Sequence, residues 1–442
     1  MEVTLGQMLQ AREDRVLRQR TLNRQWELPL ISFSMNIPGP VKDNPLIRRG
    51  FYAGCDALDG QLPASLIKHR QVIEAATGCE AVYVLDMDPL DVKKITTHME
   101  DTHPLGRLFD MDVIGPDLRK LDREVVGGGS RDCIVCGAPG RGCASRRLHS
   151  VEQLQSAVFR ILTDHVRGVD AKYIGDLAVQ SLLDEVETTP KPGLVDSRNC
   201  GSHRDMDIST FRASAAALAP YFHQCAAIGM EYRDQSPQET FARLRQAGLE
   251  AEQAMYRATK GVNTHKGAIF TIGILCGAAG RLWNPEKSWE EQEIFQEVSA
   301  MTAEAMEADW QKSGNTVGFR LYEQNGIRGI RGEVAQGLPS VADIGLPVFR
   351  RYLKEGLDRN MAAVLTLLHL IARVEDTNMI ARGGLDGARA GACRAAELLD
   401  GTPSVSQVEE LDAWFMEKNL SPGGCADLLA AVLFMDGLTG RR

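Results

Sequence analysis

The sequence predicts a multidomain protein in which an N-terminal α+β part is followed by an all-α part. Three observations support this division. The chain has 442 residues, which exceeds the size at which a single hydrophobic core usually stops growing. Strand-like segments are confined to the first part of the chain, and helix-start signals repeat after about residue 150. Hydrophobic residues make up 44% of the sequence, which is typical of a globular protein.

Three segments of the N-terminal part have the composition and length of β-strands. They are residues 30–40 (LISFSMNIPGP), 81–88 (AVYVLDMD) and 105–114 (LGRLFDMDVI). Turn-forming residues lie close to them, and helical patterns such as LGQMLQAREDRVLRQRTL surround them. Strands and helices that are mixed within one part predict an α+β or α/β fold.

After about residue 150 the strand signals disappear. Ser150, Ser236 and Ser288 each precede an acidic or amide residue by three positions, which is the spacing of a capping box, where two side chains satisfy free backbone N–H groups. Apolar residues then recur at helical spacing, as in FARLRQAGLEAEQAMY and MAAVLTLLHLIARV. These patterns predict an all-α part, a boundary near residues 167–171, and domains that span 1–168 and 169–442.

Charge and cysteine usage exclude several classes of protein. The net charge is −9, with 22 Lys and Arg against 23 Asp and Glu through residue 170 and 28 against 36 beyond it. Neither part is therefore basic enough to predict binding to nucleic acid. The sequence has no run of eighteen apolar residues and no apolar signal core at its start, which predicts a cytoplasmic protein without a membrane partner. Ten cysteines in a chain of this length do not indicate a secreted disulfide framework, so we expect most of them to be reduced.

Four polar, glycine-containing loops interrupt the helical part, at residues 188–207, 261–275, 325–340 and 376–384. The second loop opens an apolar helix, whose N-terminal N–H groups suit a phosphate, and Lys266 adds a cation. The third places Arg328 and Arg331 among glycines, where guanidinium and backbone can both approach an anion. Each loop alone has an ordinary explanation in helix capping, solvated turns or structural histidines. Because helical bundles normally use short connections, the four together predict one polyanion site with carboxylates for a metal ion or for acid–base chemistry.

Four blocks in these loops resemble the signature sequences of triphosphoribosyl-dephospho-CoA synthases, the CitG family, and of its malonate decarboxylase relative. The blocks are EVETTPKPGLVDSRNCGSHRDMD, NTHKGAIFTIGIL, GIRGEVAQGLPSV and DTNMIARGG, in the order of the family. The resemblance extends from about residue 170 to near the end of the chain and implies an all-helical fold. It also implies a reaction that joins ATP to 3′-dephospho-CoA, releases adenine and yields the precursor of the citrate lyase prosthetic group.

That reaction needs a carboxylate near C1′ of the ATP ribose, a base for the attacking hydroxyl, a proton donor for adenine and cations for the triphosphate. For acid–base or metal work we expect Asp196, His203 and Asp205. For the phosphates we expect Lys191, Lys266, Arg328 and Arg331. Further substrate contacts that the blocks imply are Asn263, His265, Glu333, Asp376, Asn378 and Arg382.

In the N-terminal part, Asp110 and Asp112 lie two residues apart within GRLFDMDVIG. Side chains alternate along a strand, so both carboxylates should point to one face, where such a pair can hold Mg²⁺ for nucleotidyl transfer. The D-x-D pattern is common, however. Asp86 and Asp88 form a second pair, which we assign to an ordinary turn before Pro89.

The segment SRDCIVCGAPGRGCASRRLHS brings several metal-binding residue types together in the sequence. Its possible zinc ligands are Cys133, Cys136, Cys143 and His149, whose spacing is compatible with a tetrahedral site. Reduced structural thiols in an arginine-rich loop are the alternative. The arginines that would suit an anionic substrate in either case are Arg107, Arg131, Arg146 and Arg147.

These segments, with ISFSMNIPGPVK upstream, resemble the CitX family of phosphoribosyl-dephospho-CoA transferases over about residues 5–165. The resemblance implies that a serine hydroxyl of the apo acyl carrier protein, the γ subunit of citrate lyase, attacks the α-phosphate of the triphosphoribosyl precursor and releases pyrophosphate. This is nucleotidyl-type chemistry, so we expect a nucleotidyltransferase-like N-terminal domain with Mg²⁺ as cofactor. The whole chain resembles a fusion of the CitX and CitG families, a bifunctional transferase with ATP and 3′-dephospho-CoA as substrates.

Three other interpretations stay open at this point. The same machinery could serve malonate decarboxylase, although fusion to a CitX-like part favours citrate lyase. The chain could be a non-catalytic assembly factor for a lyase complex, but the charged groups of all four loops argue against that. A metal-dependent N-glycosidase or ADP-ribose hydrolase is also helical with Asp-rich loops, and it would release adenine from ATP without dephospho-CoA.

Overall fold

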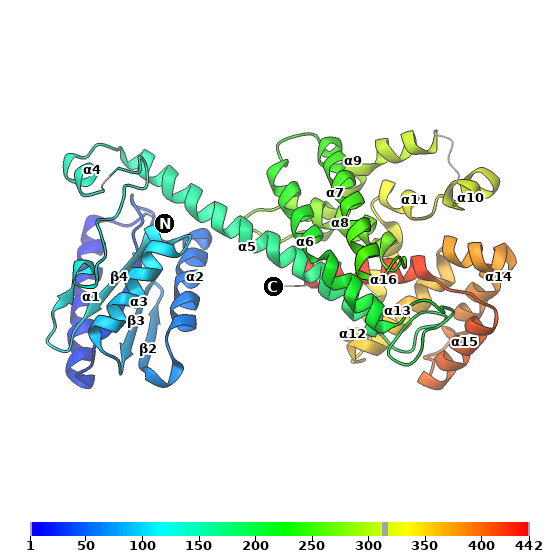
Figure 1. The fold of residues 1–442 in the computed structure, drawn as a ribbon, viewed down its shortest axis with the longest axis horizontal. Helices are drawn as coiled ribbons and strands as arrows, with labels where there is room; N and C mark the ends of the chain where they lie inside the picture. Colours follow the sequence, from blue (N-terminus) through cyan, green and yellow to red (C-terminus); the bar gives the residue numbers. More distant parts are fainter. Residues whose placement is uncertain (1, 139, 312–316, 441–442) are drawn as a thin grey trace. The chain divides into compact units, whose positions relative to one another are not determined.

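The computed structural model describes residues 2–138, 140–311 and 317–440, and the chain divides into two compact units, Met1–Gly168 and Val169–Arg442 (Figure 1). Helix α5, Val151–Glu187, contributes its first part to the first unit and the remainder to the second. Within the described ranges, no helix has both the length and the apolarity that crossing a membrane requires.

The first unit is built on one five-stranded sheet with the order β2-β3-β1-β4-β5, in which all neighbouring pairs are antiparallel. Its strands are β1 Leu30–Met35, β2 Ile67–Ile73, β3 Glu80–Leu85, β4 Phe109–Ile114 and β5 Lys120–Leu121. Its helices are α1 Leu5–Trp26, α2 Pro45–Gln61, α3 Pro89–Thr102, α4 Gly140–Arg146 and the start of α5, with 3-10 helices at Ala64–Leu66, Gly106–Leu108 and Arg123–Val126. The mixture of strands and helices confirms the predicted α+β character.

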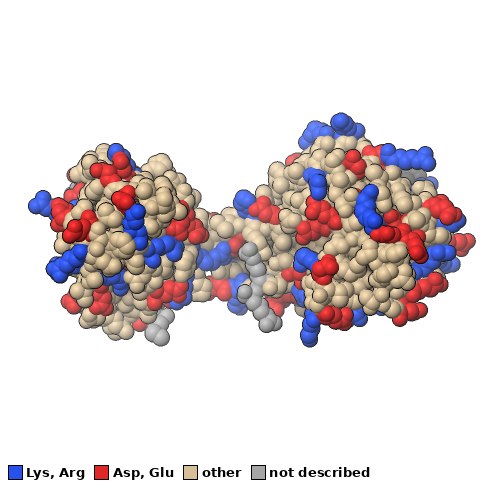
Figure 2. Space-filling model, turned by 90° about the horizontal axis from the view of Figure 1, so that it is seen from below, with Lys and Arg blue, Asp and Glu red and all other residues tan. Residues whose placement is uncertain are grey.

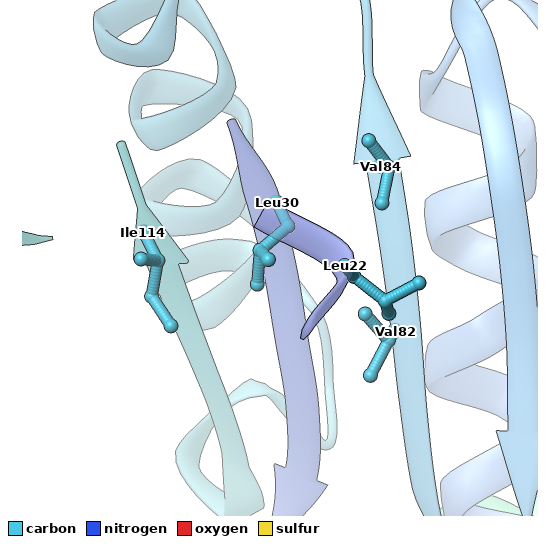
Figure 3. Close-up of a cluster of buried hydrophobic side chains, with 5 residues drawn as sticks. All are labelled: Leu22, Leu30, Val82, Val84 and Ile114. Atoms are coloured by element: carbon cyan, nitrogen blue, oxygen red, sulfur yellow. The ribbon is translucent and has the colours of Figure 1, made fainter. Parts of the chain in front are cut away.

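Helix α1 packs across one face of the sheet (Figure 1). At one end of this contact, α1 and three strands contribute a cluster of buried apolar side chains, Leu22, Leu30, Val82, Val84 and Ile114 (Figure 3). At the other end the contact is polar, because Arg15 of α1 forms an ion pair with Glu80 of β3 at 2.7 Å. The face of the sheet that α1 covers is therefore apolar at the end near Leu30 and charged at the end near Asp110.

The opposite face of the sheet packs against α2 through aromatic rings. Phe33 of β1 stacks on Phe51 of α2, with ring centroids 5.1 Å apart, and it meets Phe109 of β4 edge-on at 5.3 Å. Gly54 lets α2 come this close, because an added Cβ would lie 2.5 Å from the Phe33 ring. All three rings are fully buried, so they form the centre of the core on this side.

The strand predicted at residues 105–114 is shorter in the structure. Residues Gly106–Leu108 form a 3-10 turn, and β4 begins at Phe109. The backbone passes close to the end of α3 here, since a Cβ added at Gly106 would lie 2.5 Å from the carbonyl oxygen of Glu100. The edge strands β2 and β5 were not among the predicted strands. β2 carries a mixture of exposed and half-buried residues, so its sequence lacks the apolar run that marks a central strand.

In the second unit every regular element of the described residues is helical, which confirms the prediction of an all-α part. After α5 the elements are α6 Ile208–Glu231, α7 Pro237–Ala258, α8 Lys266–Arg281, α9 Glu291–Trp310, α10 Val317–Asn325, α11 Gly329–Ala335, a π-helical turn at Ser340–Gly345, α12 Leu346–Lys354, α13 Arg359–Arg373, α14 Thr377–Leu398, α15 Val405–Glu417 and α16 Gly423–Thr439. Helix α8 packs against α6, α7, α9 and α16 and is buried along most of its length. Gly229 of α6 lets it approach α8 closely, because an added Cβ would lie 2.1 Å from the carbonyl oxygen of Gly277.

Two of the three predicted helix starts, Ser150 and Ser236, cap α5 and α7 through their hydroxyl groups. The third prediction is wrong, because α9 begins at Glu291 and not directly after Ser288. The indole N–H of Trp289 donates to a backbone carbonyl of α8 at 2.8 Å. This bond holds the segment against α8 before the helix begins.

Acidic and basic side chains are interspersed over both units on the face drawn in Figure 2. A face that binds nucleic acid would instead present clustered Lys and Arg. On the face shown, neither unit presents a large field of one sign.

Phe33→Ala should destabilise the first unit by about 3–5 kcal/mol, because it removes a ring that contacts two others and leaves a cavity in the core. Hydrogen exchange measured by mass spectrometry in increasing urea should show that peptides from the sheet of the variant open at lower urea concentrations than those of the natural chain. Val125→Ala is the control, since this side chain is 60% exposed, and it should change stability by less than about 0.5 kcal/mol. A loss below about 1 kcal/mol for Phe33→Ala would contradict the assigned core.

Candidate active site

The four polar loops of the second unit line one cavity with a volume of about 1030 Å³. The structure brings most of the predicted residues of this unit to its wall: Lys191, His203, Asp205, Asn263, His265, Lys266, Arg328, Glu333, Asp376, Asn378 and Arg382. Pockets of about 300–1,000 Å³ hold drug-sized ligands. The volume of this cavity lies at the top of that range, so it can hold one large ligand or two smaller ones.

Two of the predicted residues, Asp196 and Arg331, do not line the cavity. Asp196 is 3% exposed, and its carboxylate accepts three backbone N–H groups of its own loop. These bonds give it a structural position, so we do not retain the acid–base or metal role for it. Arg331 lies over the ring of Trp310, 5.7 Å from the centroid, and we do not retain it as a phosphate contact.

Lys191 lines the cavity, but its ammonium group is already paired. Nζ lies 2.5 Å from Oε1 of Glu185 and 2.7 Å from the carbonyl oxygen of the same residue, and the side chain is 1% exposed. This buried pair ties the loop at 188–207 to the end of α5, so Lys191 is not a free phosphate ligand. The loop also depends on Gly201 (φ 53°), because an added Cβ would lie 2.6 Å from the backbone of Gly193. Asp412 holds the loop from α15 by accepting the Gly193 N–H at 2.8 Å.

His203 lies in the cavity wall between two hydrogen-bond partners. Its Nδ1 is 3.2 Å from a guanidinium nitrogen of Arg382, and its Nε2 is 2.9 Å from the hydroxyl oxygen of Ser421. A guanidinium group can only donate, so Nδ1 accepts and the proton of the neutral ring is on Nε2. Burial and the charge of Arg382 lower the pKa of His203, and the carboxylate of Asp205 opposes them. The ring is therefore neutral at physiological pH.

His265 is oriented by a second set of hydrogen bonds. The hydroxyl of Thr264 donates to Oγ of Ser214, which lies 2.7 Å from Nδ1 of His265. Nδ1 is therefore engaged by Ser214. Nε2 is buried and has no hydrogen-bond partner among the described residues, whereas a buried polar nitrogen normally has one. Burial lowers the pKa of His265 to about 3, so the ring is neutral at physiological pH.

Four helices begin at the cavity wall. The lining residues from their first turns are Lys266 and Gly267 of α8, Gly329 and Ile330 of α11, Thr377 and Asn378 of α14, and Gly423 and Gly424 of α16. Helix N-termini carry N–H groups without intrahelical partners and about half a unit of positive charge. Asp376 already accepts N–H groups at the starts of α14 and α16, so the positive charge left for a ligand comes mainly from Arg328, Arg373 and Arg382 in the same wall. These cations favour a ligand that has several negative charges.

Other predicted residues line the cavity while they are bonded to neighbours. Asp376 accepts three backbone N–H groups and is 2% exposed. Glu333 accepts the hydroxyl and the N–H of Ser340 at 2.6 and 3.1 Å. Lys266 forms an ion pair with Glu252 at 2.8 Å but keeps 53% of its side chain exposed, so it can turn toward a ligand.

Asp427 lies in the cavity wall on α16 and was not among the predicted residues. Its carboxylate packs on the start of α8, where a Cβ added at Gly267 would lie 1.9 Å from Oδ2. Burial, and then the charges of Glu185 and Asp376, raise the pKa of Asp427 well above its usual range. The sequence signal for it is a single acid in GGCADLLAAVLF, three residues after the second glycine.

Asp110 and Asp112 share one face of β4, as their alternation predicts. The register places them opposite Ser34 and Ser32 of β1, on the face that α1 covers. Nζ of Lys120 lies 2.5 Å from the Asp112 carboxylate. Desolvation by the surrounding protein, and then the charge of Asp112, raise the pKa of Asp110, so the two carboxylates repel each other. Asp110 lines a cavity of about 150 Å³ together with three cations, Arg12, Arg15 and Lys42.

The predicted arginines of the first unit lie in different environments. Arg131 donates to the carbonyl oxygen of Phe109 at 2.9 Å and to that of Gly106, so it binds the start of β4 rather than an open site. Arg107 is half-buried, and burial lowers its pKa. The remaining two, Arg146 and Arg147, are exposed.

The predicted zinc ligands lie close together in space. The ligand atoms of Cys133, Cys136, Cys143 and His149 all lie within 4.8 Å of one another. In the ranges that the structure describes, no other group of three or more His, Cys, Asp or Glu residues is gathered in this way. The carboxylates of the large cavity are thus more widely spaced than the ligands of a preformed metal site.

His265→Gln should reduce the loss of folding stability that the second unit shows as the pH falls. The folded pKa of about 3 lies below the ordinary value of about 6.5 in an unfolded chain. The unfolded state therefore binds the extra proton, and the stability that His265 contributes above pH 6.5 is lost as the pH falls from about 6.5 toward 3. The slope for one such group is about 1.4 kcal/mol per pH unit.

Thermal unfolding of the full chain at neutral pH and at about pH 5.5 measures this dependence. His265→Gln should lose part of the difference between the two pH values, and His98→Gln, at an exposed position, should leave the difference unchanged. Equal acid sensitivity of His265→Gln and the natural chain would show that His265 is not buried in its neutral form.

Two protein families match the two units. Residues 171–442 match CitG, described as ATP:dephospho-CoA triphosphoribosyl transferase, and residues 3–165 match CitX, described as apo-citrate lyase phosphoribosyl-dephospho-CoA transferase. Each match covers most of one unit.

Individual relatives extend over nearly the whole chain. Protein CitXG of Haemophilus influenzae is 33% identical over 459 aligned residues, which cover 99% of this chain and 97% of the relative. Protein CitXG of Leuconostoc mesenteroides subsp. cremoris is 30% identical over 467 residues, with 99% and 98% covered. A probable 2-(5″-triphosphoribosyl)-3′-dephosphocoenzyme-A synthase of Vibrio cholerae is 41% identical over 269 residues, which cover 59% of this chain and 86% of that protein. The chain therefore belongs to the CitXG family, as a fused protein with a CitX part followed by a CitG part.

Proposed function

We propose that this chain makes the prosthetic group of citrate lyase in its second unit and attaches it with its first unit. In the first reaction, ATP and 3′-dephospho-CoA give 2′-(5″-triphosphoribosyl)-3′-dephospho-CoA and adenine. In the second, the phosphoribosyl-dephospho-CoA group moves to a serine of the apo acyl carrier protein, the γ subunit of citrate lyase, and pyrophosphate leaves. The two matching families, both transferases of this prosthetic group, support the pair of reactions.

One observation in the second unit carries the first reaction: helix N-termini, arginines and carboxylates converge on a single large cavity. Both substrates are polyanions, because ATP carries a triphosphate and dephospho-CoA a diphosphate. Fixed N–H groups and guanidinium groups stabilise such charges without reorganisation. Arg328, Arg382 and Lys266 are our phosphate ligands.

The chemistry of this step requires two proton transfers. A ribose hydroxyl of dephospho-CoA attacks C1′ of the ATP ribose and loses its proton, while adenine leaves and gains one, through a transition state that resembles an oxocarbenium ion. We assign Asp205, which is exposed to the cavity, as the base for the hydroxyl, with His203 beside it. Asp427 is our acid for adenine, since its raised pKa favours the protonated form.

For the second reaction we assign Asp110 and Asp112, in a nucleotidyltransferase-like role. Their repulsion and the carboxylate chemistry fit a divalent ion, and bound Mg²⁺ would supply charge neutralisation at the α-phosphate. Arg12 and Arg15, which line the small cavity with Asp110, are placed to hold phosphates of the precursor. Lys120 now pairs with Asp112 and would be free to pair with a phosphate once that carboxylate binds a cation.

The alternative functions are less well supported. Maturation of malonate decarboxylase is not favoured, because the CitX match is to a transferase described for apo-citrate lyase. A non-catalytic assembly factor has no need of a large cavity lined by six carboxylates and five cationic side chains in its described part. An N-glycosidase would release adenine from ATP without dephospho-CoA, whereas the proposed synthase needs both substrates. An assay with and without dephospho-CoA distinguishes the two.

Adenine release by the full chain tests the first reaction directly. We expect adenine only when ATP and dephospho-CoA are both present. Release from ATP alone would favour the N-glycosidase, and no release from the two substrates with Mg²⁺ would overturn the proposal for the second unit.

Asp205→Asn and His203→Asn should each reduce the rate of adenine release by roughly 10²–10⁴-fold, because the first removes the base and the second removes the imidazole beside it. Melting temperatures should change little, since both side chains lie at the cavity wall. Asp234→Asn is the matched control, because this acid is exposed outside the cavity. Normal turnover of either variant would return that residue to a structural role.

Asp110→Asn should abolish modification of the carrier protein while adenine release continues. Free triphosphoribosyl-dephospho-CoA should then accumulate, which chromatography of the reaction mixture can quantify. Asp86→Asn is the control, because Asp86 pairs with Lys68 on the surface and its neighbour Asp88 caps α3. If Asp86→Asn stops the transfer and Asp110→Asn does not, the other D-x-D pair forms the site.

A further inference from the structure

The segment between the sheet and α5 contains four side chains that the two proposed reactions do not use. Cys133, Cys136 and Cys143 are unpaired cysteines, and His149 lies just before the Ser150 cap of α5. Their ligand atoms lie within 4.8 Å of one another. The group lies on three short pieces of chain: a turn, α4 and the lead into α5.

The spacing of the sulfurs is that of a tetrahedral metal site. With Zn–S bonds of about 2.3 Å, neighbouring sulfurs of a tetrahedron lie about 3.8 Å apart. Sγ of Cys136 and Sγ of Cys143 are 3.5 Å apart. A disulfide would bring two sulfurs to about 2.05 Å, so this separation is closer to the edge of a zinc tetrahedron than to a covalent bond.

The backbone around Cys133 is folded to support a thiolate ligand. The N–H of Cys133 donates to the carbonyl of Ala138 at 2.7 Å, and the N–H of Gly137 donates to the carbonyl of Cys133 at 2.9 Å. Gly137 has a φ of 72°, which glycine adopts without strain. A C-x-x-C-G turn of this kind presents two sulfurs to one point.

The fourth ligand has an unsatisfied ring nitrogen. Nε2 of His149 is buried and has no hydrogen-bond partner within the described ranges. A buried polar nitrogen without a partner is unfavourable. A metal ion bound by the histidine ring fixes its orientation and lets the other ring nitrogen serve as a donor, so coordination accounts for a side chain that protein contacts leave unsatisfied.

We propose that Cys133, Cys136, Cys143 and His149 bind one Zn²⁺ ion. Four protein ligands leave no open position, so the site is structural rather than catalytic. The ion orders a segment whose described residues contain no strand of the main sheet and only the seven-residue helix α4.

The zinc site also bears on the transferase reaction through Arg131, two residues before the first ligand. The Arg131 guanidinium donates to the carbonyls of Gly106 and Phe109, directly before Asp110. Zinc thus fixes the segment that holds the start of β4. Loss of zinc should lower carrier modification and leave adenine release unchanged. This pair of readouts distinguishes a structural effect in the first unit from loss of activity in the second unit.

Metal content of the full chain tests the proposal. Protein purified without a metal-affinity step should contain one zinc per chain by inductively coupled plasma mass spectrometry. Cys136→Ser and Cys143→Ser should lose the zinc. Cys200→Ser and Cys393→Ser are matched controls, because these cysteines are exposed and outside the group, and they should retain it.

A second set of variants separates coordination from misfolding. His149→Ala should lose zinc, and His149→Cys should retain it, because four thiolates also form a tetrahedral zinc site. Replacement of zinc by Co²⁺ should give a thiolate-to-cobalt charge-transfer band in the natural chain and in Cys200→Ser, but not in Cys136→Ser. Zinc content no higher in the natural chain than in Cys136→Ser would overturn the proposal. So would alkylation without reductant that shows Cys136 and Cys143 joined in a disulfide.

Discussion

One buried carboxylate, Asp376, fixes the geometry on which the cavity of the second unit depends. Its Oδ1 accepts the N–H groups of Asn378 and Met379 at the start of α14, and its Oδ2 accepts the N–H of Cys425 at the start of α16. A buried charge costs several kcal/mol unless it is compensated, and two helix N-termini supply that compensation. Gly424 leaves room for this contact, since an added Cβ would lie 3.0 Å from Oδ2. Two helices that point at one carboxylate also point their first turns into one cavity.

The two units solve the problem of binding phosphates in different ways. The helical unit surrounds its ligand with helix N-termini and arginines, and it keeps His265 and His203 neutral by burial. The sheet unit instead places two carboxylates on one strand, beside the cations of α1. This difference matches the chemistry proposed for each. Displacement of adenine at a sugar carbon needs acids and bases around C1′, whereas attack on a phosphate needs mainly charge neutralisation.

Much of the fold follows from patterns in the sequence, because those patterns reflect local physics. Alternation in FDMDVI places Asp110 and Asp112 on one face, and capping hydroxyl groups mark the starts of α5 and α7. What the sequence does not predict depends on how the folded chain pairs and packs its side chains. Lys191 has the sequence environment of a phosphate ligand, but Glu185, six residues earlier, neutralises it. Asp427 lies in an apolar helix, and only the packing of α16 on α8 brings it to the cavity.

If one chain performs both steps, the mass of the carrier protein reports the outcome of the whole sequence of reactions. Full-length protein is mixed with ATP, 3′-dephospho-CoA, Mg²⁺ and apo acyl carrier protein, and the carrier is weighed by mass spectrometry while adenine and pyrophosphate are quantified. We expect a carrier that gains one phosphoribosyl-dephospho-CoA group, with one adenine and one pyrophosphate released per carrier modified. A carrier of unchanged mass, or adenine released in equal amount when dephospho-CoA is omitted, would contradict this expectation.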